Sequence, residues 1–147
     1  MNILQQTKIV PIAFPQARVN NAAVTTATVD TIGFNKCRIK VLIGDIDATM
    51  AVFKVAESDD SGMSGETDIT STIFGGTGNP ALPLATDDNK VYLIHLDLKG
   101  RKRYLDLKLT TGNGAAGAFV TADAELYDGL TVPNTAAEQG AAVCIYV

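Results

Sequence analysis

The sequence predicts an all-β protein, an antiparallel β-sandwich or jelly roll with an extended N-terminal arm. Short apolar runs alternate with polar residues, and clusters of Gly, Pro, Asn, Asp and Ser separate these runs. No helical periodicity extends beyond about two turns, and the helical crossovers of about a dozen residues that an α/β fold needs are missing. We expect an arm over residues 1–23, a sandwich domain over 24–127, and a connector with an edge strand over 128–147.

Length and composition indicate one globular domain. The chain has 147 residues, of which 46% are hydrophobic and 19% charged, and single domains commonly have about 100–200 residues. Disorder of the whole chain would require less hydrophobicity and more charge. The net charge of −4 argues against a general nucleic-acid binder, which carries a basic excess.

Targeting signals are missing from the sequence. The N-terminus has no basic region followed by an apolar one, so we expect no secretory signal. No apolar run approaches the roughly 18 residues of a membrane span. We therefore expect a protein that is made in the cytoplasm and does not enter a membrane.

The first half of the chain predicts several strands. Pro11 and Pro15 cannot donate to a central ladder, so the arm is predicted to be extended, with an edge strand over residues 7–12. Residues 22–29 are a candidate first core strand. Residues 37–43 and 49–55 are expected to form two strands that are joined as a hairpin across 44–47. A further strand is expected over 69–74.

The second half contains the clearest alternation. Residues 91–98 carry apolar side chains on both faces, which indicates a central strand or a face covered by a partner. Residues 104–110 alternate cleanly, with Leu105, Leu107 and Leu109 directed inward. The Asn-Gly pair within residues 112–114 predicts a tight hairpin to a strand over 118–126.

The C-terminal region differs from this pattern. Residues 128–142 are a connector rich in small residues, with a conceivable helical turn over 135–139. Residues 143–147 are predicted to form a terminal strand.

No group of residues indicates an enzyme, a metal site or a cofactor. His95 is the only histidine, and no serine lies in a Gly-x-Ser-x-Gly elbow, so we interpret His95 as structural or exposed. Cys37 and Cys144 are too few for a zinc site; we interpret them as buried small hydrophobes, and a disulfide between them stays open. The Gly-x-Gly-x-x-Gly spacing of residues 112–117 precedes a strand rather than the helix that dinucleotide binding requires. The paired aspartates, as at Asp59, lack EF-hand spacing and are interpreted as solvated turns.

A basic cluster is the most distinctive charge feature. It comprises Lys99, Arg101, Lys102 and Arg103, followed by Tyr104. One interpretation is a solvated turn that discourages aggregation of strand edges. The other is a docking surface for an acidic protein, with nucleic acid a weaker alternative.

Three stretches carry a family resemblance. Residues 84–107, 29–34 and 57–61 together resemble small virion proteins encoded among the head genes of tailed bacteriophages and prophages. The resemblance covers roughly residues 24–127 and brings no catalytic residues. It implies a non-enzymatic virion protein of the head, made in the host cytoplasm. The expected role is a capsid decoration, or cement, protein that bridges neighbouring major capsid proteins.

The resemblance also implies partners. The expected partners are the major capsid protein and further copies of the chain, as a dimer or trimer; no membrane partner is expected, and nucleic acid is only the weaker alternative for the basic cluster. The alternatives are a tail or head-fibre component, and a carbohydrate-binding sandwich, against which the absence of Trp counts. The candidate partner-binding residues are Lys99, Arg101, Lys102, Arg103 and Tyr104 of the basic cluster, and Thr7, Ile9, Val10, Ile12 and Phe14 of the arm.

Overall fold

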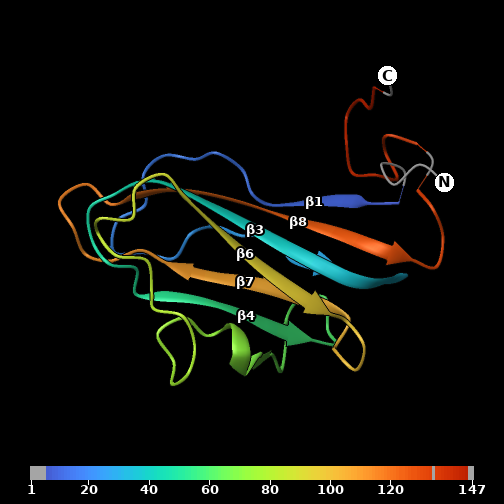
Figure 1. The fold of residues 1–147 in the computed structure, drawn as a ribbon, viewed down its shortest axis with the longest axis horizontal. Helices are drawn as coiled ribbons and strands as arrows, with labels where there is room; N and C mark the ends of the chain where they lie inside the picture. The colour runs from blue at the N-terminus through green and yellow to red at the C-terminus, as the bar shows by residue number, and fades with distance from the viewer. Residues whose placement is uncertain (1–5, 134, 146–147) are drawn as a thin grey trace.

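Two antiparallel four-stranded sheets lie face to face in the computed structural model, which describes residues 6–133 and 135–145 (Figure 1). The first sheet has the strand order β1-β8-β3-β6 and the second β2-β7-β4-β5. The prediction of an all-β sandwich is confirmed. The elements are β1 Lys8–Ala13, β2 Val29–Asp30, β3 Phe34–Ile46, β4 Val52–Ser58, β5 Thr67–Asp68, the 3-10 helix η2 Thr70–Thr72, β6 Lys90–Asp97, β7 Tyr104–Thr110 and β8 Ala118–Gly129.

The core lies between the sheets and follows the period-two pattern. Alternate residues of each long strand point inward, because successive side chains of a strand lie on opposite faces. Large residues of β3 lie opposite small residues of β8: Ile39 is paired with Ala124, and Val41 with Ala122. The buried apolar side chains of three of the long strands are Cys37, Ile39, Val41, Ile43 and Ile46 of β3, Leu105, Leu107 and Leu109 of β7, and Ala118, Val120, Ala122, Ala124 and Leu126 of β8.

Most connections cross from one sheet to the other. Among the described strands, β4 and β5 are the only consecutive pair that share a sheet. The predicted hairpins at residues 44–47 and 112–114 are therefore wrong. Strand β3 continues through a register shift to Ile46, which is paired with Ala118, before the chain crosses to β4. The turn residues at both places serve crossings between sheets.

Asp47 joins two of these crossings. Its carboxylate accepts backbone N–H groups from Ala116 and Gly117, the latter at 3.0 Å. These bonds, led by the one from Ala116, lower the pKa of Asp47. The carboxylate thus stays charged and fixes the β7–β8 crossing against the β3–β4 crossing.

Two predicted strands of the first half are replaced by other structure. Residues 69–74 contain η2, because the Thr72 hydroxyl donates to Ile69 O at 2.8 Å and accepts the Val55 N–H at 3.0 Å. These bonds close a tight turn against β4 and remove the strand geometry. Residues 22–28 make backbone hydrogen bonds to residues 109–111 and to Ile12, with one isolated bridge from Ala23 to Thr110, but they form no strand before β2 begins at Val29.

Strand β6 is an edge strand, so the central-strand alternative is wrong. It pairs with β3 alone among the described strands. Ile94, Leu96 and Leu98 are buried, whereas Val91 and Leu93 are exposed on the outer face.

The N-terminal arm requires a correction. Strand β1 pairs with β8, from Lys8 opposite Leu126 to Ala13 opposite Ala122, which agrees with the edge strand expected over residues 7–12. Ile12 and Ala13 are buried in the core. Residues 8–13 are therefore a strand of the sandwich and do not form an arm separate from it.

The C-terminal residues pack on β1 without forming a strand. Thr135 and Glu138 exchange hydrogen bonds in a reciprocal cap, and Gln139 N donates to Thr135 O at 3.1 Å. Ile9 N then donates to Gln139 O at 2.8 Å. Gly140 has φ +74°, and a Cβ there would overlap the Ile9 carbonyl oxygen. The predicted strand is wrong over residues 143–145, and residues 146–147 lie outside the described part.

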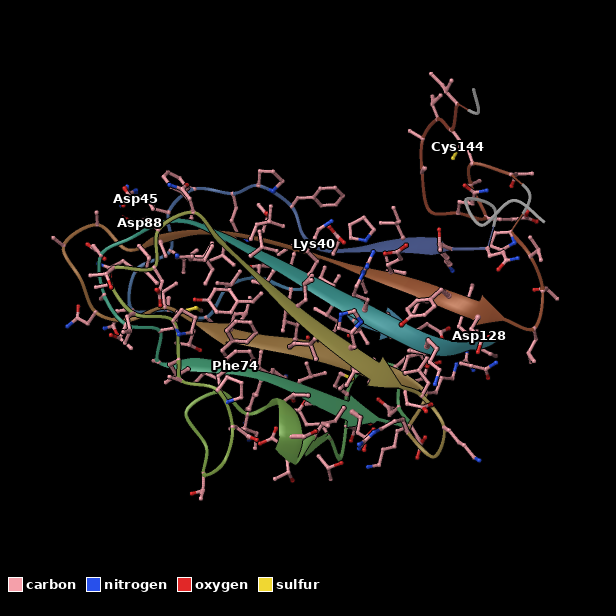
Figure 2. All side chains as sticks on the ribbon, in the orientation of Figure 1. Lys40, Asp45, Phe74, Asp88, Asp128 and Cys144 are labelled. Carbon is pink, nitrogen blue, oxygen red and sulfur yellow. The ribbon has the colours of Figure 1, made fainter. Side chains whose placement is uncertain are left out.

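The two cysteines are free and differ in environment. Cys37 is buried in the core, where desolvation raises the pKa of its thiol to about 12. Cys144 is half-buried in the C-terminal segment, well outside the sheets, with its Sγ 3.1 Å from Gln139 Oε1 (Figure 2). The structure therefore contains no disulfide between them.

We expect a thiol reagent to distinguish the two cysteines. The thiolate is the reactive form, so Cys37 should be inert in the native protein while Cys144 reacts. Titration with an aromatic disulfide at about pH 8 should detect one reactive thiol per chain in buffer and two in denaturant. The Cys144→Ser variant serves as the control and should show none in buffer. Rapid reaction of two native thiols would contradict the packing around Cys37.

Candidate docking surface at one end of the sandwich

Segments distant in sequence meet at the end of the sandwich where β1 begins and β8 ends (Figure 1). Arg103 O accepts the Thr31 N–H at 3.1 Å and the Thr31 hydroxyl at 2.6 Å, and Leu130 N donates to Gly33 O at 2.8 Å. We name this end the terminal surface; it consists of residues 31–33, the basic turn 99–103, the connector 130–133 and the tail 135–145. These bonds hold residues 31–33 to the basic turn and to the connector, whereas the tail is held to β1 by the Ile9 N–H to Gln139 O bond and to the connector by Gln139 Nε2, which donates to Pro133 O at 3.2 Å.

The terminal surface exposes several apolar side chains. Leu130 and Ile145 are each 80% exposed, and Val143 and Ile32 are also exposed. Single exposed apolar residues are ordinary, but a group rimmed by polar residues is typical of a surface that binds another protein. The chemistry available here is therefore burial of apolar area against a partner.

Two of the four cations in the basic turn are neutralised within the chain. Arg103 makes a bidentate bond to Asp30, at 2.8 and 2.7 Å, and lies 4.9 Å over the Tyr104 ring. This hydrogen bond lowers the pKa of Asp30 and raises that of Arg103. Arg101 is 3.4 Å from Glu57. Both arginines therefore fasten the turn to neighbouring strands.

Of the other two cations, Lys99 is exposed, whereas Lys102 is half-buried and its backbone N–H donates to Glu57 at 3.3 Å. For Lys99 and Lys102 no ion pair occurs within residues 6–133 and 135–145. The turn is shaped by Gly100, with φ +76°, and by Lys99 N donating to Asp97 at 3.1 Å. Lys99 and Lys102 are thus the part of the predicted cluster that remains available to an acidic partner.

The candidate residues of the arm lie in three different environments. Thr7 and Ile9 are at the start of β1, beside the tail. Val10 packs partly on the core, and Ile12 is buried within it, so Ile12 is removed from the accessible candidates. Phe14 is exposed just beyond the other end of β1. Only Thr7 and Ile9 join the terminal surface.

A shallow hollow opens beside the terminal surface. It has a volume of about 280 Å³ and lies between Gln6 and Thr7, just before β1, and the last residues of β8. Arg38 and Glu125 form an ion pair in its wall, and Asp128, which has φ +55°, also lines it. The hollow is open, and its charged side chains add hydrogen-bonding groups beside the apolar area.

The residues weighed for catalysis or metal binding are dispersed. His95 is exposed on β6, opposite Arg38. Asp60 accepts the Gly62 N–H at 2.8 Å, and Asp88 accepts the Ile46 N–H at 2.9 Å. Within residues 6–133 and 135–145, no three His, Cys, Asp or Glu side chains are placed to hold one metal ion. In the same residues, no helix is long and apolar enough to cross a membrane.

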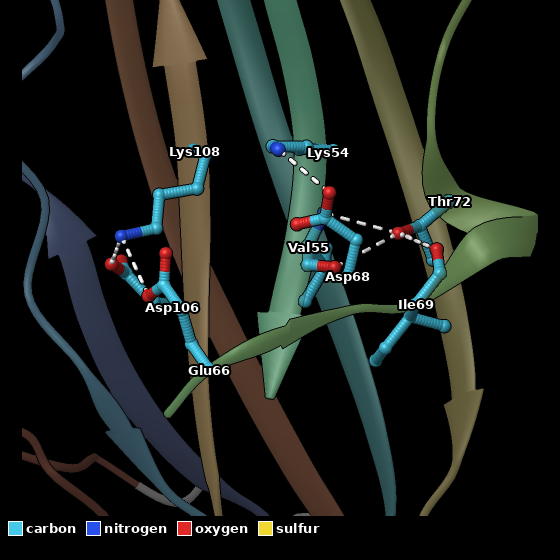
Figure 3. A network of polar contacts seen from close by, with 8 residues as sticks. All are labelled: Lys54, Val55, Glu66, Asp68, Ile69, Thr72, Asp106 and Lys108. Carbon is cyan, nitrogen blue, oxygen red and sulfur yellow. Dashed lines mark hydrogen bonds and ion pairs between the residues drawn. The ribbon is translucent and has the colours of Figure 1, made fainter. Parts of the chain in front are cut away.

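The outer face of the second sheet contrasts with the terminal surface. Lys54 and Lys108 are directly opposite each other on β4 and β7, a like-charge pair that is unfavourable alone. Lys54 lies 2.7 Å from Asp68, and Lys108 lies 2.8 Å from Asp106 and 2.9 Å from Glu66 (Figure 3). Bonding to Asp106 and Glu66 raises the pKa of Lys108. The lysines of this face are therefore neutralised by carboxylates of the same face.

Sequence reasoning did not identify Ile32 or Leu130 as contact residues. Each is one apolar residue in a polar turn, and a pattern search gives such a residue no weight. The signal becomes visible only when the Leu130 N–H to Gly33 O bond places the two turns together.

Comparison with known proteins identifies no relative. No protein-family model matches the chain, and a search of curated proteins finds no match either.

Proposed function

We propose that the chain is a non-enzymatic virion structural protein, a capsid decoration protein that bridges neighbouring copies of a major capsid protein and stabilises a phage head. The resemblance of residues 24–127 to small head-gene proteins supports this role. The observation that carries it is the exposure of Leu130 and Ile32 in two turns that the Leu130 N–H to Gly33 O bond holds together, with further exposed apolar residues in the tail. A rigid sandwich that presents such a surface is suited to bind a protein lattice.

A cement protein can stabilise a shell through many contacts that are each of modest strength. A stable protein interface buries about 1,200–2,000 Å² in total. When one subunit contacts two neighbours in a lattice, the second contact forms at high effective concentration, so that avidity exceeds either single affinity. The backbone bonds that hold the terminal surface keep its ordering cost low, because little conformational freedom is lost on binding.

The apolar part of the terminal surface is tested by a double substitution. We expect Leu130→Ser with Ile145→Ser to reduce occupancy on purified heads of the encoding phage at least several-fold, because each side chain buries apolar area worth about 1.5–3 kcal/mol. Both residues are exposed, so the fold should persist by circular dichroism. Occupancy is measured by quantitative gel analysis of sedimented heads.

The matched control for that experiment is Leu84→Ser. Leu84 is an exposed leucine in the loop between η2 and β6, outside the terminal surface. Its substitution should leave occupancy unchanged. Equal losses in the control and the double variant would contradict the assignment of this surface.

The basic turn is expected to contribute through long-range attraction. Lys99→Gln with Lys102→Gln should weaken binding at about 50 mM salt and have less effect near 200 mM, where screening is stronger. Lys54→Gln is the control, because that lysine is paired with Asp68 on the second sheet. If the double variant keeps the occupancy and salt dependence of the unmodified protein, the cluster is only a solvated turn.

A further inference from the structure

One edge of the sandwich lacks the protection that the other edges have. On β1, Pro11 has no N–H to donate, and Ile9 N and Ile12 O are bonded to Gln139 and Ala27. Strands β2 and β5 have two residues each. Strand β6 has eight residues without proline or register shift, and among the described strands only β3 pairs with it. Such an edge presents alternate unpaired N–H and C=O groups as a template for another strand.

The side chains along this edge are apolar on the solvent side. Val91 is 57% exposed and Leu93 51%. Leu42 of β3 is opposite Val91, and Phe119 joins them around an open hollow of about 320 Å³. This part of the outer face has the composition of an interface rather than of a solvated sheet.

The rest of the same face is occupied by ion pairs. Lys40 lies 2.9 Å from Asp123, and Lys36 lies 2.8 Å from Asp97. The bond to Lys36 lowers the pKa of Asp97, so this carboxylate is charged at neutral pH. The apolar area is therefore confined to the part of the face next to the first residues of β6, and it ends where the charged pairs begin.

An open hollow lies beside β6. The chain between η2 and β6 runs near this edge but does not pair with it, and a hollow of about 300 Å³ separates them. Its walls include Phe74 and Pro80 on one side and Leu93 and His95 of β6 on the other. The middle of the β6 edge is thus not covered by the neighbouring segment of its own chain.

We propose that β6 pairs antiparallel with β6 of a second copy of the chain about a two-fold axis near Leu93, joining the two first sheets into one. The strand begins with Lys90 and ends with Asp97. Antiparallel pairing places Lys90 of each copy at the same end of the pair as Asp97 of the other, whereas parallel pairing would place the two Lys90 residues at one end and the two Asp97 residues at the other. Leu93 then meets its equivalent, and Val91 faces His95 of the second copy. A contact of this kind is self-complementary and closes as a dimer.

This dimer supplies the self-contact included in the proposed function, but its test requires no capsid. Sedimentation velocity of the purified chain, from about 1 to 100 µM, should show twice the 15.5 kDa monomer mass. Leu93→Lys should weaken the dimer by roughly tenfold or more, because two cations would meet at the axis. Ile32→Lys is the matched control, since Ile32 is an exposed apolar residue of the β2–β3 turn. It should leave the dimer intact.

A second variant tests the register independently of stability. Leu93→Cys in a Cys144→Ser background should form a covalent dimer on mild oxidation, because the two Cβ atoms face each other across the axis. Ile32→Cys in the same background should stay monomeric on a non-reducing gel. A chain that is monomeric at all concentrations, or an oligomer that Leu93→Lys leaves unchanged, overturns the proposal. Neither result bears on capsid binding, so the failure of one proposal is distinguishable from the failure of the other.

Discussion

Replacing Phe53 with alanine is expected to lower the free energy of unfolding by about 3–5 kcal/mol, the usual range for a buried Phe→Ala change. Phe53 is buried at the centre of an aromatic group. Its ring stacks on Phe74 at 4.1 Å and meets the edge of Tyr92 at 5.6 Å. Since domains of this size have about 5–15 kcal/mol of stability in total, this loss is large.

The aromatic group explains why the effect should be large. Phe74 belongs to the segment that follows η2, and its N–H donates to Phe53 O at 2.9 Å. The ring of Phe53 thus attaches that segment, as well as β4, to the first sheet through Tyr92. Removing the ring leaves a cavity and frees Phe74 from its stacking partner.

Equilibrium denaturation by urea measures this prediction. Phe14→Ala is the control, because Phe14 is an exposed phenylalanine and its change should stay within about 0.5 kcal/mol. Equal losses for the two variants would show that the aromatic group does not hold the two sheets together.

Replacing Gly117 with alanine is expected to cost about 2–6 kcal/mol. Gly117 has φ +87°, a conformation that costs a residue with a side chain about 1–3 kcal/mol. A Cβ would also overlap Val19 O and lie 2.7 Å from Val19 C and 2.8 Å from Asn20 Cα. Crowding of this kind adds about 1–3 kcal/mol, because Val19 is held in place by two backbone bonds to Ala118, at 3.0 and 2.9 Å.

The control for Gly117 separates backbone strain from crowding. Gly65 also has a positive φ, of +63°, but nothing lies within 4 Å of a Cβ built there. Gly65→Ala should therefore cost only the conformational part, about 1–2 kcal/mol. Thermal and urea unfolding of both variants gives the difference. If Gly117→Ala loses no more stability than Gly65→Ala, the close approach of residues 19–20 to the β7–β8 crossing is contradicted.

The faces of the strands could be predicted from the sequence, and their partners could not. Leu105, Leu107 and Leu109 are buried as expected, because a period of two decides which side of a strand faces the core. The same pattern does not say which sheet a strand joins. The segments 44–47 and 112–114 have the composition of hairpin turns, yet both belong to crossings between the sheets, which Asp47 joins by accepting the N–H groups of Ala116 and Gly117.

In two segments, the contacts of single side chains decided the structure against what the sequence pattern predicted. Residues 69–74 have the β-branched and aromatic composition of a strand, but the Thr72 hydroxyl satisfies backbone groups of Ile69 and Val55 and so stabilises η2. The prolines of residues 1–23 suggested a loose arm, and Pro11 is in fact compatible with an edge strand. What fixes β1 in the sandwich is the burial of Ile12.

The candidate site was only partly visible in the sequence. The basic cluster is a local feature and was found, whereas its neutralisation was not. Arg103 is paired with Asp30 and Arg101 with Glu57, partners 73 and 44 residues away in the chain. Contacts at such separations depend on the topology, which the sequence pattern did not supply. The exposed leucine at position 130 became significant for the same reason.

A cryo-EM map of the proposed phage head would decide between these roles. We expect density for a two-sheet sandwich between neighbouring capsid subunits, with Leu130 and the tail residues facing the shell. Density at the tail or in fibres would favour the alternative virion role. Heads without such density, or contacts made through the ion-paired face of the second sheet, would contradict the proposed function and its docking surface.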